Sequence, residues 1–456
     1  METFDVVVVG GGSAGCAAAE RLVERTDLRI CLLEAGPDYG AFGDARWPAE
    51  LLDAARMPRT HDWDYSETRD GELRPESRAK VIGGCSTHNQ CAAVWGQPED
   101  YDAWGIPAWA FDDLEPLVRD VDRLVGAAPS TELASWQGAW LEAAVNDGFP
   151  RLADVGERGA GAGVAPFRAN IKEGVRWNAA FSFLDRVRSR PTLTVRGGVE
   201  VEVVEEGANG VTLTCIDSSG RFALEGRRCL FCAGAYGSPS ILLRSALGGD
   251  EVGANLHDHC GVRVRFRPSD VAKRRLAADF DSGRFRQSQV IARARTADAG
   301  AFDLHIAPYQ TQTDQGEWTF QVLAFLLNPR SRGRFSLVDG VARIDFGFLT
   351  DTADESALGE ALRIVRKLAR VEPLAALIDG ELEPADADIR TTLTGYAHAV
   401  GTCALGKVVD SDCRVRGTNH VYVADASIIP TIPRANPNLT CFLIGLRAAD
   451  LLVAAG

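Results

Sequence analysis

The sequence lacks the features that mark a membrane or secreted protein. None of its apolar runs approaches the roughly 20 residues needed to cross a bilayer. Its start, Met1 to Asp5, has no basic segment followed by an apolar one, so no signal peptide is expected. Basic residues are outnumbered, 49 against 63 acidic ones, and the net charge of -14 argues against nucleic acid or anionic lipid as a partner. We therefore expect a cytoplasmic protein without a membrane span.

Internal repeats and low-complexity segments are also missing. The composition, 46% hydrophobic and 25% charged, is that of a globular protein with ample material for a core. The length of 456 residues predicts two or three domains.

The eleven cysteines do not form a recognisable disulfide framework, because their number is odd and they are scattered along the chain. We expect reduced thiols. Cys229 and Cys232 have a spacing that zinc sites use, but in a strand an offset of three puts the two side chains on opposite faces. No second pair of this spacing lies nearby, so we expect no metal site, although zinc stays an alternative.

The first forty residues carry a complete nucleotide-binding pattern. A β-branched run ends in Gly10, a helix-forming segment follows Gly15, and a second strand ends in Glu34. In such a pattern the first glycine allows a tight turn, the second lets a pyrophosphate approach the backbone, and the third lets helix and strand pack closely. Glu34 stands where an acid can accept hydrogen bonds from a ribose. The motif predicts a dinucleotide site and leaves NAD and FAD open.

The stretch from Gly83 to Cys91 combines two glycines, a histidine and two cysteines. Three interpretations fit these residue types: a metal site, a redox thiol pair, or a wall built against a cofactor. His257 and His259 pose a similar question, since their spacing suits a metal and equally a structural loop. Residues 37–80 are irregular and predict a long excursion over a cofactor or active site.

The remaining chain shows recognisable strand and helix patterns. We expect helices within 99–126, from Ser240, at 354–371, at 385–395 and at 438–454. Strands are expected at 193–195, 199–204, 211–216, 228–232 and 421–423. Gly261 to Phe266 and Ala342 to Leu349 alternate as strands of an antiparallel sheet in a second domain.

Candidate functional residues gather near the C-terminus. His398 is one histidine in an apolar, small-residue run, which alone more often marks a structural residue than a catalyst. Asp425 ends a strand among small residues. Asn436 precedes the last helix, whose free amide groups would suit a polar ligand.

Taken together, these motifs resemble the glucose–methanol–choline (GMC) oxidoreductase family of FAD enzymes, with motifs most like choline oxidases. The residues that carry the resemblance are Gly10 to Gly15 with Glu34, Gly83-Gly84 with His88 and Asn89, Ala233-Gly234 with Ser238-Pro239, Val252 to His259, His398 with Gly401-Thr402, and Asp425 to Asn438.

The resemblance implies an α/β chain with two domains. A Rossmann-like FAD-binding domain would comprise 1–110, 191–260 and 405–456. A substrate domain, with an antiparallel sheet flanked by helices, would comprise 111–190 and 261–404 with connecting segments. The function implied is oxidation of an alcohol by hydride transfer to flavin N5, with oxygen or another carrier as the electron acceptor. The oligomeric state stays open, with a homodimer as one candidate.

The resemblance also assigns roles to residues. It makes His398 the base or the stabiliser of the alkoxide, and Asn436 a hydrogen-bond donor to the substrate oxygen. It implies a covalent bond from His88 to the 8α-methyl carbon of the flavin, and it makes the loop of His257 and His259 structural. The cofactor-binding residues implied are Gly10, Gly12, Ser13, Ala14, Gly15, Glu34, Ala35, Val81, Gly83, Gly84, His88, Asn89, Gln90, Val201, Ala233, Asp425, Ala426, Asn438 and Thr440.

The match departs from choline oxidases where the substrate would bind. Arg284 to Val290 carries arginines and glutamines but no acid to meet a trimethylammonium group, so choline is not expected. The arginines, if they point inward, would suit a neutral polyol or an anion. Tyr396 stands where a smaller residue matters for oxygen access, which leaves a dehydrogenase using a quinone as an alternative. A lyase with non-redox FAD, or a flavin-binding protein without turnover, is a further alternative.

Overall fold

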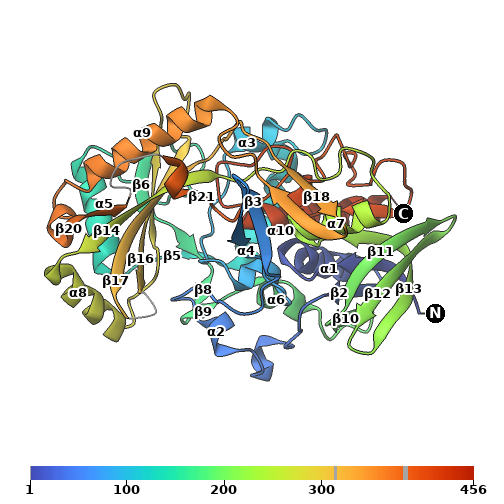
Figure 1. Cartoon of the computed structure of the whole chain (residues 1–456). Coiled ribbons are helices and arrows are strands. Elements are labelled where there is room, and N and C mark those ends of the chain that lie inside the picture. The colour runs from blue at the N-terminus through green and yellow to red at the C-terminus, as the bar shows by residue number, and fades with distance from the viewer. Residues whose placement is uncertain (1, 313–315, 384–388, 456) are drawn as a thin grey trace.

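The computed structural model describes residues 2–312, 316–383 and 389–455. Within them two larger sheets form the two ends of the molecule, and a smaller sheet and long connecting segments lie between (Figure 1). The helices are α1 Ser13–Arg25, α2 Ala49–Leu52, α3 Pro98–Asp102, α4 Phe111–Val125, α5 Ser135–Asn146, α6 Ala179–Ser182, α7 Gly234–Arg244, α8 Asp270–Asp281, α9 Thr352–Leu368 and α10 Asn438–Ala454.

The first sheet has the strand order β10-β2-β1-β13-β12-β11, and β22 also pairs with β13. Its centre is parallel, with Val8 of β1 opposite Leu32 of β2 and Leu230 of β13. β11, β12 and the first half of β13 form an antiparallel meander. The strands are β1 Thr3–Val9, β2 Ile30–Glu34, β10 Leu193–Gly197, β11 Glu200–Gly207, β12 Gly210–Asp217, β13 Gly220–Phe231 and β22 Val421–Val423.

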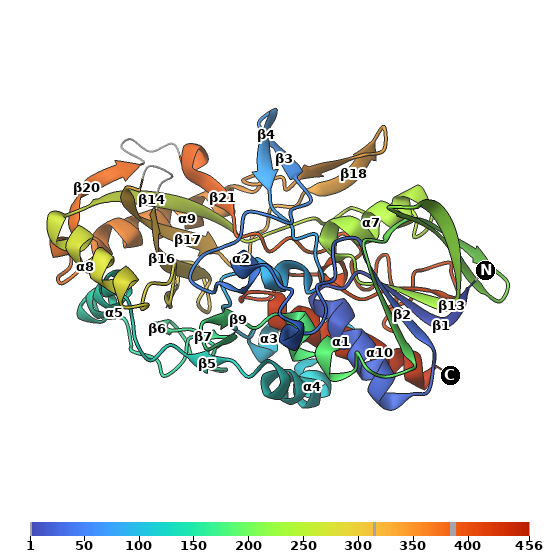
Figure 2. The ribbon, with the colours of Figure 1, turned by 90° about the horizontal axis from the view of Figure 1, so that it is seen from below.

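Helices α1 and α10 lie side by side against this sheet (Figures 1 and 2). The approach is close because α10 has a glycine at the contact: a Cβ atom on Gly445 would lie 2.2 Å from the carbonyl oxygen of Ala14. The alanine-rich face of α1 and the larger apolar side chains of α10 are buried in the core that contains β1 and β2. This packing brings the N-termini of α1 and α10 to the same edge of the sheet, where Ser13 Oγ donates to Asn438 Oδ1 at 2.6 Å.

The second sheet is antiparallel in the order β20-β14-β17-β16-β15-β6, with β21 also paired to β14. Its core is separate from that of the first sheet and includes side chains of α5, α8 and α9. The strands are β6 Gly163–Pro166, β14 Cys260–Pro268, β15 Val290–Ala294, β16 Leu304–Gln312, β17 Trp318–Leu326, β20 Ile378–Glu383 and β21 Leu393–Gly395.

A four-stranded sheet in the order β18-β19-β3-β4 joins segments far apart in the sequence. Its two hairpins project from one side of the molecule in Figure 2. The strands are β3 Tyr65–Arg69, β4 Glu72–Glu76, β18 Arg334–Val338 and β19 Val341–Asp345, and two short pairs are β5 Ala128–Pro129 with β7 Arg168–Ala169 and β8 Ile171–Lys172 with β9 Val175–Arg176.

Three expected elements differ from those observed. Ala342 to Leu349 was expected in the second-domain sheet, yet β19 pairs with β18 and reaches β3. The helix expected from Ser240 begins at Gly234, because the carboxylate of Asp425 accepts the N–H of Gly234 at 2.8 Å and holds the first turn. Of the helix expected at 385–395, residues 384–388 lie outside the described chain, and the rest is a 3-10 turn, Ile389–Thr392, followed by β21.

The overall class, an α/β fold with a second, antiparallel sheet, agrees with the prediction, whereas the domain boundaries stay a prediction. No described helix is both long and apolar enough to cross a membrane. The cytoplasmic location and the homodimer likewise stay predictions.

Candidate active site

A pocket of about 700 Å³ is lined by residues of both larger sheets. That volume lies in the upper part of the roughly 300–1,000 Å³ range of small-molecule sites. One arm runs along the glycine turn after β1, the end of β2 and the start of α7. The other faces β16, β17 and residues 395–399. A long ligand in the first arm would therefore present one end to the second sheet.

The glycine turn is shaped by close backbone contacts. A Cβ atom on Gly10, whose φ is +103°, would lie 2.5 Å from the carbonyl oxygen of Cys232. Glu34 ends β2 beneath this turn and accepts the N–H groups of Gly11 and Gly36, both at 2.8 Å. Burial raises the pKa of Glu34, while these two hydrogen bonds oppose the rise. The carboxylate is therefore held at the pocket wall, where a ribose hydroxyl could donate to it.

The segment from Gly83 to Asn89 packs directly on that turn. Gly83 donates its N–H to the carbonyl of Gly11 at 2.7 Å, and a Cβ atom on Gly84 would lie 2.6 Å from Cα of Gly12. The 3-10 turn Gly84–Thr87 follows and delivers His88 and Asn89 to the pocket. Cys85 lines the pocket, whereas Cys91 is buried beside Arg176. Of the three interpretations of this stretch, the geometry favours a wall facing a ligand.

His88 has one ring nitrogen without a partner. The ring is buried and lines the pocket, and Nε2 has no hydrogen-bond partner. The backbone of Thr60 lies close to the ring and opposes the fall in its pKa, as an acceptor for the hydrogen on the other ring nitrogen would. Burial lowers the pKa of His88, so the ring is neutral. Nε2 then carries a free electron pair at the pocket wall.

His398 belongs to a chain of hydrogen bonds that sets the position of its protons. His259 Nε2 lies 3.1 Å from the carbonyl oxygen of Pro433, which can only accept, so Nε2 of His259 carries the hydrogen. Nδ1 of neutral His259 must then accept, and it lies 3.0 Å from Nδ1 of His398. His398 therefore carries its hydrogen on Nδ1 and an electron pair on Nε2.

The electron pair of His398 points toward the second predicted catalytic residue. The amide Nδ2 of Asn436 lies 3.2 Å from Nε2 of His398 and donates to it. Both residues line the pocket. Burial lowers the pKa of His398 well below its usual range, and the neighbouring His259 and Arg78 add to the effect. The imidazole is thus neutral at pH 7 and can accept a proton from a group in the pocket.

Asp258 supports the backbone of His398. Its Oδ1 accepts the backbone N–H of His398 at 3.1 Å. Burial raises the pKa of Asp258 to about 8, so the carboxyl is largely protonated at neutral pH. His257, the other neighbour, accepts the N–H of Ile432 at Nε2 and bonds the carbonyl of Asn255 through Nδ1. His257 therefore braces the loop before Asn436, as a structural role requires.

Among the described residues, one group could hold a metal ion. It consists of Asp258, His259 and His398, whose ligand atoms lie within 4.8 Å of one another. In this structure the two imidazoles are already hydrogen-bonded to each other, and Asp258 binds backbone N–H. We interpret the group as a proton-holding network. Cys229 and Cys232 take no part in it.

The pocket gathers most of the predicted site residues, although they come from distant parts of the chain. Those that line it are Gly10, Gly12, Ser13, Ala14, Glu34, Ala35, Gly84, His88, Asn89, Gln90, Val201, Ala233, His398, Asp425, Ala426, Asn436 and Asn438.

Four predicted cofactor-binding residues lie outside the lining. Gly15 packs α1 against the turn, since its Cβ would lie 1.9 Å from the carbonyl oxygen of Gly10. Gly83 supports the turn from behind, and Val81 is buried in the core. The hydroxyl of Thr440 pairs with that of Tyr101 at 3.0 Å.

Sequence reasoning missed His259 and the second-sheet wall of the pocket. The spacing of His257 and His259 attracted notice, but nothing local to it reveals a partner 139 residues away. The excursion 37–80 does contribute lining residues, among them Met57, Trp63 and Tyr65, as its composition predicted.

Comparison with known proteins agrees with this architecture. Residues 4–261 and 329–445 match the two sequence models described as GMC oxidoreductase. The chain belongs to the GMC oxidoreductase family. It is 28% identical to a GMC-type oxidoreductase of Rhodococcus erythropolis, over 98% of each chain. It is also 28% identical to choline oxidase of Arthrobacter globiformis, over 99% of this chain and 94% of that one. The crystal structure of pyridoxine 4-oxidase from Mesorbium loti superposes with a TM-score of 0.84, at 26% identity and 98% coverage of both chains.

Family membership confirms the predicted enzyme class, an FAD-dependent alcohol oxidoreductase. The residues present fit FAD. The glycine turn and Glu34 suit its pyrophosphate and ribose, and the unpartnered Nε2 of His88 lies in the same pocket. The N-terminus of α10 adds the positive end of a helix dipole at Asn438, which favours negative charge on a bound group.

Proposed function

We propose that this protein oxidises an alcohol to a carbonyl compound with His398 as the base. The observation that carries the proposal is the hydrogen-bond chain from Pro433 through His259 to His398, which leaves the electron pair of His398 on the pocket side. FAD bound in the pocket supplies the hydride acceptor, its N5 atom. The protein has to remove the hydroxyl proton and hold the substrate oxygen in place.

The residues divide that work. His398 accepts the hydroxyl proton at Nε2, and the proton shared with Nδ1 of His259 spreads the resulting charge over two rings. The amide of Asn436, now donating to His398, can donate to the substrate oxygen instead and hold it for the transfer. His259 is fully buried and His398 is partly buried, which limits the access of water to this proton transfer.

We propose oxygen as the electron acceptor, with hydrogen peroxide as the product. A dehydrogenase that passes electrons to a quinone is the second candidate. Tyr396 favours that candidate, since its ring centroid lies 4.2 Å from that of His398 and fills space near the base. Reoxidation of the reduced protein by air separates the two: recovery of the yellow colour within seconds supports an oxidase, and recovery over many minutes supports a dehydrogenase.

We further propose that His88 binds FAD covalently through Nε2. Formation of this bond would remove one hydrogen from the flavin 8α-methyl group and one from the imidazole, that is two protons and two electrons, and oxygen or another acceptor would take up the electrons. The wild-type protein should then stay yellow after acid precipitation. His88→Ala should release free FAD into the supernatant, because the nucleophilic nitrogen is gone.

Cys85 offers a matched control for this linkage, since its thiol lines the same pocket and could form a thioether instead. Cys85→Ser should keep the acid-stable colour. Loss of the colour in Cys85→Ser, with retention in His88→Ala, would move the bond to the thiol. A colourless wild-type pellet would remove the covalent link altogether.

The low pKa of His398 predicts the pH dependence of flavin reduction. The reaction needs the neutral imidazole, and that form is lost only as the pH falls through the folded-state pKa, which burial holds well below 6.5. We expect the anaerobic reduction rate constant to stay level from pH 6.5 to 8 and to fall only at more acidic pH. Stopped-flow absorbance at 450 nm measures it, and an acid limb centred above 6.5 would contradict the assignment.

A further inference from the structure

The second-sheet wall of the pocket is uncharged. It is built from β16, β17 and the segments around Phe167, 287–291 and 395–399, so it includes His398, and it lies beside Asn436. Among the described residues of these segments, none that lines the pocket is Asp, Glu, Lys or Arg. The side chains that dominate the wall are Phe167, Tyr309, Phe325 and Tyr396, with Gln321 and Ser288 as neutral polar groups.

The charged residues that line the pocket lie in the arm along the glycine turn and α7, or they are paired with another residue. Glu34 and Asp425 accept backbone N–H groups beside the glycine turn and α7. Arg78 forms an ion pair with Glu76 at 2.8 Å. Moving a charged substituent from water to the second-sheet wall would leave it without a partner, and such burial is costly.

Aromatic faces lie next to the proposed base. Tyr396 stacks on Phe325 with ring centroids 3.6 Å apart and an angle of 6°. Tyr309 contacts the hydroxyl of Tyr396, and the Tyr396 ring adjoins His398. Flat rings bind well against such surfaces, in stacked or edge-on arrangements.

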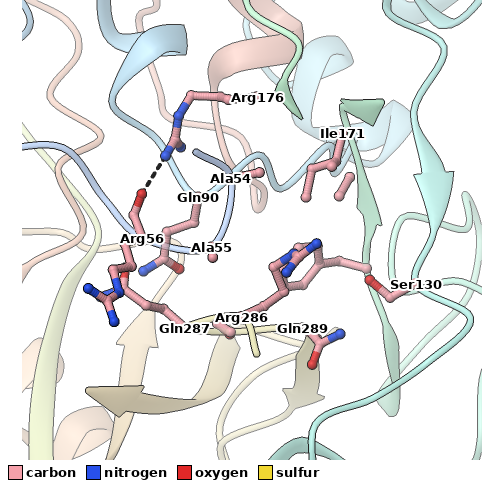
Figure 3. Close-up of a pocket in the computed structure, with 13 residues that line it drawn as sticks. Ala54, Ala55, Arg56, Gln90, Ser130, Ile171, Arg176, Arg286, Gln287 and Gln289 are labelled. Atoms are coloured by element: carbon pink, nitrogen blue, oxygen red, sulfur yellow. Dashed lines mark hydrogen bonds between the residues drawn. The ribbon is translucent and has the colours of Figure 1, made fainter. Parts of the chain in front are cut away.

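The arginines near the pocket do not offer an anion site. Arg56, Arg176 and Arg286 line a neighbouring cavity of about 10 Å³, shown in Figure 3, which has room for about one water molecule. Arg176 Nη2 donates to the backbone carbonyls of Asp53 and Arg56 at 2.7 and 2.5 Å. Arg286 Nη1 likewise donates to the backbone carbonyls of Gly283 and Phe285, at 3.1 and 2.6 Å.

Arg284, the other arginine of this stretch, pairs with Asp279 at 3.1 Å. The anionic substrate that these arginines suggested in the sequence is therefore disfavoured.

We propose that the substrate is an uncharged alcohol whose carbinol carbon is attached to an aromatic ring, and that Ser288 meets a polar group on that ring. Ser288 is buried between the pocket and the small cavity of Figure 3, lines both, and its Oγ has no partner, so it can bind a ring hydroxyl or ring nitrogen. The inference rests on the proposed function. The alcohol would lose its hydroxyl proton to His398 and a hydride to bound FAD and would become an aldehyde or ketone, with oxygen or another carrier taking up the two electrons.

Anaerobic flavin reduction by four matched alcohols tests the proposal. The probes are benzyl alcohol, cyclohexylmethanol, 4-(hydroxymethyl)benzoate and its 4-trimethylammonio counterpart. Benzyl alcohol should give a second-order reduction rate constant at least about tenfold above each of the others, because the wall binds a ring and has no partner for a charge. A charged or saturated probe that matches benzyl alcohol would overturn the proposal.

The same experiment separates this inference from the proposed function. Reduction by cyclohexylmethanol, but not by benzyl alcohol, would leave alcohol oxidation standing and remove the aromatic substrate. If no alcohol reduces the flavin while dithionite does, both the proposed function and the substrate class fail.

A negative charge placed on the second-sheet wall should favour the positively charged probe over benzyl alcohol. Gln321 lines the pocket on β17, and Gln321→Glu should raise the rate ratio of the trimethylammonio probe to benzyl alcohol about tenfold through attraction between opposite charges. Gln312→Glu makes the same change at an exposed position of β16 and should leave the ratio unaltered. Equal ratios in the two variants would show that Gln321 does not face the substrate.

Discussion

Replacing His398 with alanine is expected to slow anaerobic flavin reduction by roughly 10²–10⁴-fold, the usual contribution of a positioned general base. The hydrogen-bond chain leaves an electron pair on Nε2 of His398, and this pair points toward Asn436 and the pocket. FAD should stay bound, since its proposed contacts lie on the glycine turn, η2 (Gly84–Thr87) and α10. Stopped-flow reduction with saturating alcohol measures the effect.

His420→Ala is the matched control for this substitution. His420 lies on the loop before β22 and does not line the pocket, so its loss should leave the reduction rate within about twofold of wild type. Added imidazole should restore part of the rate of His398→Ala by entering the space that the ring leaves. A rate near that of wild type in His398→Ala would refute the assignment of the base.

His259 is expected to control the reaction without contacting the substrate. His259→Leu keeps a side chain of similar size but is apolar, and it removes the acceptor of the His398 Nδ1 hydrogen. The imidazole can then turn or place its hydrogen on Nε2, and we expect the reduction rate constant to fall about 100-fold, as small misplacements of reacting groups do. The apparent substrate dissociation constant should change little.

His259→Gln separates this positioning role from a purely structural one. The glutamine amide can donate to the Pro433 carbonyl while its oxygen accepts from His398, so it reproduces both hydrogen bonds. We expect its rate to recover to within about threefold of wild type. The melting temperatures of the His259→Leu and His259→Gln holoproteins should agree within a few degrees. If both variants lose the same rate, His259 has no role in setting the tautomer of His398.

The sequence predicted best those elements that are determined by residues within the element or next to it. The first strand, the glycine turn, α1 and Glu34 lie within forty residues, and each residue type has one physical reason to be there. The last helix was expected at 438–454, and α10 has those bounds because Pro437 precedes a long apolar segment. For such segments, composition and spacing contain most of the information.

The features that were missed depend on distant partners. The start of α7 is held by Asp425, 191 residues further on, and the glycines before Ser240 look like a loop until that contact is known. The role of His259 depends on His398 and Pro433. The uncharged wall combines two strands and three further segments, whose side chains face one pocket only after the second sheet has formed.

The most direct test of the account is the visible spectrum of the purified holoprotein, kept free of oxygen and mixed with a panel of alcohols that includes benzyl alcohol, sugars and amino alcohols. The account predicts that the absorbance near 450 nm is bleached by an alcohol of the panel, that the matching aldehyde forms in equal amount, and that His398→Ala slows the bleaching. Full colour with every alcohol, in a protein that dithionite still reduces, would contradict it and would favour a role for FAD without redox chemistry.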